Sequence, residues 1–290
     1  MKCLRTPLII LFASTVLSNF AFPWGANGHR ITAQIGQNHL SEKSQKAVEE
    51  LLGSASLAQV ATWPDYIRSE KKWDFAKDWH FLTVDDDEFL EDVLKEANSG
   101  DKEKSIDNVV EAIEYFSDIL AGDTKKLGEF KDLLTAHGVE PHRSPEATAL
   151  IFLVHFVGDV HQPLHVGRSN DYGGNTIKVL WFGEESNLHS VWDEGLIENE
   201  GLSFTEFSKF IDQVSKDDIS KWQKSKPAIW AQESIDYRPE VYHVTLELGQ
   251  KPEEIKELSY QFAHDKIPII KERLKKGGIR LAGRLNSIFK

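Results

Sequence analysis

The sequence predicts an all-α fold in a single compact domain, with a small β-hairpin or strand inserted near residues 175–183. The first observation is that apolar residues recur at a helical spacing close to 3.6 in several segments. In residues 105–121, for example, one buried stripe is expected to contain Ile106, Val109, Val110, Ile113, Phe116 and Leu120. The second observation is that 40% of the 290 residues are hydrophobic and eight are Trp, which is enough for a large core. A mainly disordered chain is therefore excluded.

Six segments have the helical pattern and follow one another without a Pro-rich or Ser-rich linker. They are residues 31–40, 41–52, 105–121, 145–159, 204–215 and 253–267. One interruption is rich in β-forming residues: the run TIKVLWF follows two glycines and an asparagine, which predicts a projecting strand or hairpin. Residues 85–104 are acidic and polar, so we expect a solvated loop there. One domain over residues 24–290 is the simplest organisation.

The first 23 residues have the features of a secretory signal peptide. Two basic residues precede an apolar run at residues 8–17, which is too short for a membrane span. We therefore expect a secreted or periplasmic protein without a membrane anchor. Signal peptidase prefers a small residue such as Ala21 before the cut, so the mature chain is expected to begin at Phe22 or, after trimming, at Trp24. Cys3 leaves with this segment, and no disulfide is expected.

The charge balance restricts the possible partners. The chain has 34 basic and 46 acidic residues, a net charge of −12. Such a charge argues against a nucleic-acid partner held in a basic groove. Bound metal cations would remove this objection, because they bring positive charge into a site on an acidic protein.

Histidine and aspartate occur together at a spacing that suits a metal site. His155 and Asp159 are four residues apart in a nearly uncharged apolar helix, so they share one face. His189 and Asp193 repeat this spacing on a second predicted helix. A single pair of this kind is usually a surface ion pair. Two pairs, one of them within an apolar helix, favour a metal, since burying such groups without compensation costs several kcal/mol.

A further histidine follows the first pair. Pro163 is expected to end the helix and to direct His165 toward the same cleft, whereas His161 lies off the shared face and is expected to pack beside the site. Carboxylates and imidazoles without thiolates suit zinc better than manganese or iron. The residues alone therefore predict a zinc site.

The ordered set of motifs that surrounds these residues is specific. It comprises WGANGH (24–29), ATWPDYIR (61–68), DWHF (78–81), HFVGDVHQPLH (155–165), GGN (173–175), HSVWD (189–193) and GIRLAGRLN (278–286). With these motifs the sequence resembles the zinc-dependent single-strand-specific nucleases of fungi and plants, the S1/P1 type. This family shares its helical fold with bacterial zinc phospholipase C.

The resemblance implies three Zn²⁺ ions and nine ligand residues. The first zinc is implied to bind Asp65, His80, His155 and Asp159. The second is implied to bind His165, His189 and Asp193. The third is implied to bind the backbone amine and carbonyl of Trp24 together with His29, with Asp159 as a bridge to the first. A free amine at Trp24 requires removal of everything before it.

The resemblance also implies the reaction and the substrates. The expected activity is hydrolysis of single-stranded RNA and DNA to 5′-mononucleotides, together with 3′-nucleotidase activity, by a zinc-activated water. No stable protein partner is expected. Asp65 is implied to ligate zinc and to orient the attacking water, and Arg68 could stabilise charge on the phosphate. The alternative for Arg68 is a surface ion pair.

A base pocket is implied by three further residues. Phe81 resembles the stacking aromatic of the family and Asn175 its base-edge residue, while Gly174 permits close approach of the backbone. Stacking requires an unpaired base, so a preference for single strands would follow. The alternatives are that Phe81 belongs to the core and that the glycines form only a turn.

Two other classes of function remain open on the sequence alone. The first is a zinc phospholipase C on the same fold, although Asp193 stands where those enzymes have Glu. The second is a zinc site with a storage or structural role, which would need no Arg68. Replacement of Arg68 separates the catalytic from the structural alternative.

Overall fold

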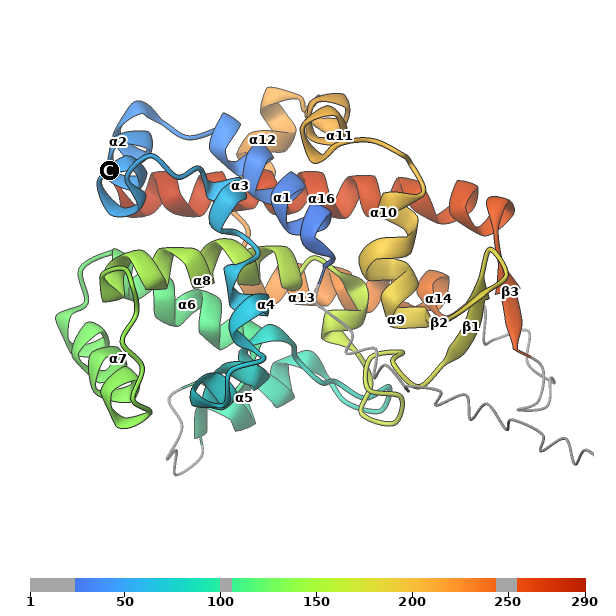
Figure 1. The fold of residues 1–290 in the computed structure, drawn as a ribbon, viewed down its shortest axis with the longest axis horizontal. Coiled ribbons are helices and arrows are strands. Elements are labelled where there is room, and N and C mark those ends of the chain that lie inside the picture. The colour runs from blue at the N-terminus through green and yellow to red at the C-terminus, as the bar shows by residue number, and fades with distance from the viewer. Residues whose placement is uncertain (1–23, 100–105, 244–254) are drawn as a thin grey trace, which may run out of the picture.

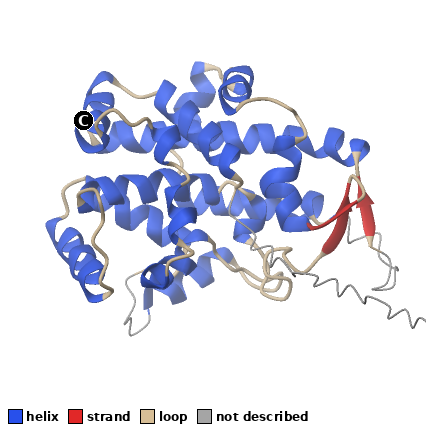
Figure 2. Cartoon of the chain, in the orientation of Figure 1, coloured by secondary structure: helices blue, strands red, loops and turns tan. Residues whose placement is uncertain are grey.

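The computed structural model describes residues 24–99, 106–243 and 255–290 of the chain (Figure 1). The expected signal peptide, with Cys3, lies outside these residues. Within them helices dominate, and three short strands form one small sheet at an end of the molecule (Figure 2). The predicted all-α fold with a small strand insertion is therefore confirmed. None of the helices in the described part of the chain combines the length and the apolar composition that a membrane span requires.

Four long helices form the frame of the molecule: α1 (Ala26–Asn38), α6 (Val109–Leu120), α8 (Pro145–Asp159) and α16 (Tyr260–Ile288). Helix α1 packs along α16, and α6 packs along α8 (Figure 1). The contact of α1 with α16 is close because it contains glycine. A Cβ atom on Gly278 would lie only 2.5 Å from side-chain atoms of Ile35. A larger residue at this position would therefore push the two helices apart.

Further elements connect and cover this frame. Between α1 and α6 they are α2 (Glu42–Leu52), α3 (Leu57–Val60), α4 (Trp63–Ile67), the 3₁₀ segment η1 (Lys71–His80) and α5 (Leu90–Ser99). Helix α7 (Thr124–Ala136) precedes α8. After α8 come the 3₁₀ turn η2 (Pro163–Val166), α9 (Leu188–Ser190), the π-helical turn η3 (Val191–Gly195), α10 (Leu196–Glu198), α11 (Phe204–Ile211), α12 (Lys216–Gln223), α13 (Pro227–Asp236) and α14 (Arg238–Val241).

The hydrophobic core has two parts. The larger part lies around α6 and α8, where Phe152 stacks on Phe116 at 5.1 Å and on Phe156 at 5.4 Å between ring centroids. The smaller part joins η3 to α1 and α16 and contains the fully buried Trp24 and Trp192. The predicted stripe of α6 enters the larger part, with only Leu120 half-buried. The space between the two parts is where the polar residues of the site gather.

Helix α8 begins and ends as its sequence predicts. The Ser144 side chain accepts a hydrogen bond from the Ala147 amide at 3.1 Å, and proline occupies the first turn, where a missing N–H costs nothing. From Ala147 onward every residue of α8 is buried. The helix therefore has no solvent face, and its two ionisable residues near the end, His155 and Asp159, must find partners inside the protein.

The sheet has the strand order β2-β1-β3. Strands β1 (Lys178–Trp181) and β2 (Glu184–Asn187) form the predicted antiparallel hairpin. Its two turn residues, Phe182 and Gly183, both have positive φ angles, of 49° and 85°. This is the backbone that a two-residue hairpin turn favours. Strand β3 (Lys256–Leu258) pairs with β1 in parallel and comes from a distant part of the chain, which periodicity within one segment does not detect.

Two local predictions are wrong. Residues 85–104 were expected to form a solvated loop, yet Leu90–Ser99 is helix α5. Leu90, Val93 and Leu94 of this helix have helical spacing and pack on the larger core, so a genuine apolar stripe lies within an acidic sequence. The helix predicted over residues 253–267 contains strand β3, and α16 begins only at Tyr260.

Candidate metal centre

The last turn of α8 places two ionisable side chains on one face. His155 and Asp159 are both fully buried, and Nε2 of His155 lies 3.2 Å from Oδ2 of Asp159. His80, at the end of η1, reaches the same point with its Nδ1 atom 3.0 Å from Asp159 Oδ2 and 3.1 Å from His155 Nε2. The three residues form one group whose ligand atoms converge.

A second group lies next to the first. His189 Nε2 is 3.0 Å from Asp193 Oδ2, and His165 Nε2 is 3.7 Å from Asp193 Oδ1. The π-helical turn η3 begins between His189 and Asp193 and keeps them on one side. Pro163 opens η2 directly after the end of α8 and returns His165 to within 3.6 Å of Asp159. The predicted convergence of these residues is therefore present in the structure.

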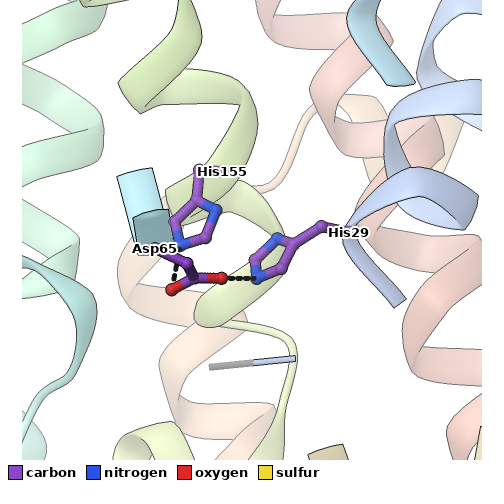
Figure 3. Close-up of side chains that lie close together, drawn as sticks. All are labelled: His29, Asp65 and His155. Carbon is purple, nitrogen blue, oxygen red and sulfur yellow. Dashed lines mark ion pairs between the residues drawn. The ribbon is translucent and has the colours of Figure 1, made fainter. Parts of the chain in front are cut away.

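The third group joins three different helices. His29 comes from α1, Asp65 from α4 and His155 from α8 (Figure 3). The rings of His29 and His155 stack at 3.8 Å between centroids. The Asp65 carboxylate faces the Nε2 atoms of both, with Oδ2 3.9 Å from His29 Nε2 and Oδ1 3.6 Å from His155 Nε2. Oδ1 of Asp159 is 3.3 Å from His29 Nε2. His155 thus belongs to two groups, and Asp159 connects the first group to His29.

The beginning of the described chain is fixed beside these groups. The buried indole of Trp24 donates a hydrogen bond to the Gly158 carbonyl of α8 at 2.7 Å. The Gly25 amide donates to the Asp193 carbonyl at 2.9 Å. The side chain of Trp24 therefore contacts the end of α8 that carries Asp159, and the backbone of the next residue contacts Asp193.

Backbone carbonyls determine the tautomer of three of the histidines. The Nδ1 atom of His155 donates to the Ala61 carbonyl at 2.7 Å. His165 donates in the same way to the His80 carbonyl at 2.8 Å, and His189 to the Gly173 carbonyl at 2.6 Å. Each neutral ring consequently has an unprotonated Nε2 that points into the site, which is the arrangement of metal-binding histidines in proteins.

Many of these buried atoms have no hydrogen-bond donor. Among the described residues, the buried side-chain atoms without a partner include Nδ1 and Nε2 of His29, Oδ1 of Asp65, Oδ1 of Asp159, Nε2 of His165 and Oδ2 of Asp193. Such atoms are rare in folded proteins because desolvation without a partner is costly. The lone pairs of carboxylate oxygens and imidazole nitrogens repel one another at this distance unless a positive charge lies between them. The donor set therefore fits metal cations.

The pKa shifts of the groups agree with this conclusion. Burial is the main cause that raises the pKa of Asp65 to about 8 and that of Asp159 well above its usual range. Burial also lowers the pKa of His29 and His80 well below the usual value for imidazole. Burial thus favours the neutral forms of these four residues. At His189 burial by itself would lower the pKa, but the charge of Asp193 and the hydrogen bond to it raise the pKa of the imidazole. A divalent cation would reverse the preference of the carboxyl groups and hold them as carboxylates.

An open cleft of about 390 Å³ adjoins the centre. His80, His165 and His189 line its inner side. Arg68 lines it as well, with Nη1 3.8 Å from Asp65 Oδ1 and about a third of its side chain exposed. The arginine therefore faces the entrance of the site with an acidic partner, rather than forming an ion pair remote from it.

Phe81 and Asn175, two of the three residues expected to form a base pocket, line this cleft, and the third, Gly174, does not. Phe81 is 42% exposed, so it is not a core residue. Asn175 lines the cleft, and its amide nitrogen donates to the Tyr172 carbonyl at 2.8 Å. The glycine that lines the cleft is Gly173, whereas Gly174 is buried against Leu164.

Three residues near the site were not among the predicted ones. Gln162 donates from Nε2 to Asp193 at 2.5 Å and accepts from the Leu164 amide, which orients a candidate ligand. Its position inside the HQPLH run, next to a predicted ligand, could have identified Gln162 as a residue near the site. Tyr172 and Arg168 also line the cleft, and no spacing pattern marks them. His161, in contrast, lies outside the three groups, as expected: it donates to the Val157 carbonyl and accepts from Arg280.

Three buried His/Asp groups beneath an open cleft in a helical protein are the arrangement expected of a metal-dependent hydrolase. Comparison with known proteins makes the class specific. The family model described as S1/P1 Nuclease matches residues 24–290. The chain therefore belongs to the S1/P1 nuclease family, which makes it a nuclease with nucleic acid as its class of substrate.

Individual relatives are similar in sequence to this chain along almost its whole length. Endonuclease 1 of Arabidopsis thaliana is 31% identical over 302 residues, which cover 97% of this chain and 90% of that protein. Endonuclease 2 of the same plant is 29% identical, with 97% of each chain covered. Nuclease S1 of Aspergillus oryzae is 27% identical, also with 97% of each covered.

Proposed function

We propose that this protein is a secreted or periplasmic, zinc-dependent nuclease that cleaves single-stranded RNA and DNA to 5′-mononucleotides and removes the phosphate of 3′-nucleotides. The observation that carries this proposal is the set of buried, partnerless acceptor atoms beneath a cleft with an exposed aromatic wall. The acceptors call for cations, and the cations would give an acidic protein a positive site for a phosphodiester.

Three Zn²⁺ ions are the proposed cofactors. The residues that would hold them are Trp24, His29, Asp65, His80, His155, Asp159, His165, His189 and Asp193. Zinc fits because nitrogen and oxygen donors are combined without thiolates and with neutral imidazoles. When bound, zinc lowers the pKa of a coordinated water and neutralises negative charge on phosphate oxygens.

The side chains at the entrance would orient the reactants. The Asp65 carboxylate accepts a hydrogen bond from the attacking water and thereby aligns it with the phosphorus atom. Arg68 donates to the phosphate oxygens, where negative charge grows during the displacement. The water oxygen forms a new bond to phosphorus, and the bond between phosphorus and the 3′ oxygen breaks. The attacking water gives up one proton through the Asp65 carboxylate, and the leaving 3′ oxygen takes up one proton from solvent, so the products would be a 3′-hydroxyl and a 5′-phosphate.

Selectivity for single strands would come from the outer side of the cleft. A base can stack on Phe81 only if it is not paired and not stacked within a duplex. One N–H of the Asn175 side chain donates to the Tyr172 carbonyl, so its second N–H and its side-chain oxygen are the groups that would hydrogen-bond to the base edge. The pocket therefore contributes affinity for bases as well as for phosphate.

Maturation is part of the proposal. The α-amine of Trp24 can bind zinc only if the peptide bond before it is cleaved. We propose that residues 1–23 are a signal peptide, removed directly or by trimming of a Phe-Pro dipeptide. N-terminal sequencing of the secreted protein tests this step: a mature chain that begins at Phe22 and still holds about three zinc ions would contradict it.

Arg68→Ala is the variant that tests the function. With a chain that begins at Trp24, the substitution should leave zinc content unchanged and lower kcat on single-stranded RNA by about 10²–10³-fold. The matched control is Lys77→Ala, since Lys77 is half exposed and pairs with Asp74 outside the cleft.

Phosphatidylcholine is the second substrate to assay. Cleavage of RNA without lipid hydrolysis supports the proposed nuclease function. Lipid hydrolysis without RNA cleavage would instead indicate a phospholipase C. Full activity of Arg68→Ala would contradict the role given to the arginine.

A further inference from the structure

The loop between η2 and β1 contains an exposed aromatic residue in an unfavourable backbone conformation. Tyr172 has a φ angle of 52°, and 73% of its surface is exposed. Bulky residues rarely adopt this left-handed conformation, because Cβ approaches the backbone. Burial of the ring does not offset the strain, since the ring faces solvent. Strain of this kind that the surrounding structure maintains is typical of functional positions.

The surrounding loop imposes the conformation. The Asn175 side chain donates to the Tyr172 carbonyl at 2.8 Å, and the Tyr172 amide donates to the Ser169 carbonyl at 3.3 Å. The next residue, Gly173, accepts from Nδ1 of the candidate ligand His189 at 2.6 Å. The position of Tyr172 is thus fixed relative to the metal centre through one intervening residue.

Tyr172 lines the same cleft as three histidines of the metal centre. The cleft is lined by Tyr172 and Phe81 as well as by His165 and His189. Two partly exposed aromatic residues, Phe81 at 42% and Tyr172 at 73%, therefore line one open cleft next to the candidate metal centre. Aromatic surface presented to an open cleft binds the faces of planar ligands, and unpaired nucleobases are such ligands.

We propose that Tyr172 is a second base-stacking residue, whose ring packs on an unpaired nucleobase of the nucleic acid in this cleft. This inference rests on the proposed nuclease function and extends it, because it assigns a substrate contact to a residue outside the implied pocket of Phe81, Gly174 and Asn175. Since the ring carries no charge, its contribution to binding does not depend on salt, unlike that of the phosphate contacts.

The left-handed backbone permits an unusually clean test. Glycine adopts positive φ without strain, so Tyr172→Gly removes the ring and relieves the backbone together. We expect this variant to keep or raise the melting temperature of the zinc-loaded enzyme. Lower activity of Tyr172→Gly then cannot be attributed to misfolding. Tyr172→Phe preserves the stacking surface and should retain most of the affinity.

The experiment measures KM and kcat on two oligonucleotides, one a single-stranded DNA and the other of equal length with abasic sites in place of the bases. For Tyr172→Gly we expect KM on the DNA to rise about 5- to 50-fold at both low and high salt. KM on the abasic oligomer should not change. Phe210→Ala removes another exposed aromatic residue, on α11 outside the cleft, and is the matched control.

The possible outcomes separate this inference from the function on which it rests. An unchanged KM for Tyr172→Gly on DNA, or an equal rise on the abasic oligomer, would overturn the role of Tyr172 and leave the nuclease intact. If the unsubstituted zinc-loaded enzyme cleaves neither oligomer, the proposed function itself fails.

Discussion

Two buried polar clusters meet at the end of α8, and they differ in how their charges are balanced. One is the metal centre. The other, here called the arginine network, consists of His161, Glu233, Arg273 and Arg280. Glu233 accepts from Arg273 at 2.6 Å and from both Nη atoms of Arg280 at 2.7 Å. Arg280 also donates to His161 Nε2 at 2.9 Å.

The difference lies in the pairing of donors and acceptors. In the arginine network, guanidinium donors face a carboxylate, a ring nitrogen and backbone carbonyls, so most of its members satisfy one another. In the metal centre, carboxylate oxygens and bare imidazole nitrogens face each other. Among the described residues, Nε of Arg280 is the only buried side-chain atom of the first cluster without a partner, whereas the second cluster has an excess of acceptors that calls for a cation. Burial of polar groups alone therefore does not indicate a ligand site; an excess of acceptors does.

The arginine network also supports the metal centre mechanically. Arg273 donates to the His161 carbonyl at 2.9 Å, and Ser234 donates to the Val160 carbonyl at 2.7 Å. These bonds hold the turn that follows Asp159 against α13 and α16. The comparison therefore predicts that substitutions in the metal centre abolish metal binding and activity, and that substitutions in the network mainly lower stability.

Removal of one charge from the metal centre should have the largest effect. Asp159→Asn keeps the shape of the side chain but removes the carboxylate that contacts His29, His80 and His155. We expect kcat/KM on single-stranded RNA to fall by more than about 100-fold and the zinc content to fall with it. Steady-state kinetics and elemental analysis are the measurements. Normal activity with a full complement of zinc would contradict the assignment of Asp159.

The matching change in the arginine network should act on stability. Glu233→Gln leaves Arg273 and Arg280 without their carboxylate, and both guanidinium groups are buried. We expect the free energy of unfolding in urea to fall by about 3 kcal/mol, because an uncompensated buried charge remains. Zinc content should stay unchanged. If Glu233→Gln lost zinc but kept its full free energy of unfolding, the different roles assigned to the two clusters would be contradicted.

The pH dependence of stability sharpens the same comparison. Burial by itself would raise the pKa of Glu233, but the hydrogen bond and charge of Arg280, with Arg273 and Lys276, lower it to about 2. Since the folded pKa lies below the unfolded value of 4.5, the stabilisation is complete above about pH 4.5 and is lost as the pH falls toward 2.

Metal-free protein is suited to this measurement, because acid also releases zinc. The difference in unfolding free energy between the unsubstituted chain and Glu233→Gln should shrink from pH 5 toward about pH 2. A difference that stays constant over this range would show that the carboxylate of Glu233 is not the source of the stability.

The smallest effect is expected at the outer side of the cleft. Phe81→Leu keeps an apolar side chain but removes the flat ring, so KM for single-stranded oligonucleotides should rise about tenfold with little change in kcat. A fluorescence assay of cleavage measures both constants. Equal KM values for the two enzymes would place Phe81 outside the substrate contacts.

Local periodicity explains which parts of the centre the sequence could predict. His155 with Asp159 and His189 with Asp193 are visible because a helical spacing of four fixes their relative direction. The placement of Asp65 beside His155 depends on how α4 and α8 pack, and only the resemblance to a known family supplied it. The resemblance assigned His29 to a different zinc, together with Trp24, and the approach of His29 to Asp65 and His155 follows from the packing of α1 on α8. Neither helical spacing nor the family resemblance predicts how a side chain is oriented within an irregular loop.

The parts that were missed depend on distant pairing or on loop geometry. Strand β3 forms only because β1 offers an edge, and α5 carries its apolar stripe within an acidic segment. Glu233 and Arg280 are neighbours through the packing of α13 on α16 rather than through sequence. The positive φ angle of Tyr172 could not be predicted either, since aromatic residues rarely adopt the left-handed conformation.

Metal content is the most direct test of the claim that the buried acceptors are held by cations. The measurement is elemental analysis of the chain that begins at Trp24, purified without added metal or chelator, for the unsubstituted protein, Asp159→Asn and Glu233→Gln. We predict about three zinc ions per chain in the first and third proteins and fewer in the second. A metal-free protein that is fully active and gains no thermal stability on addition of zinc would contradict the account.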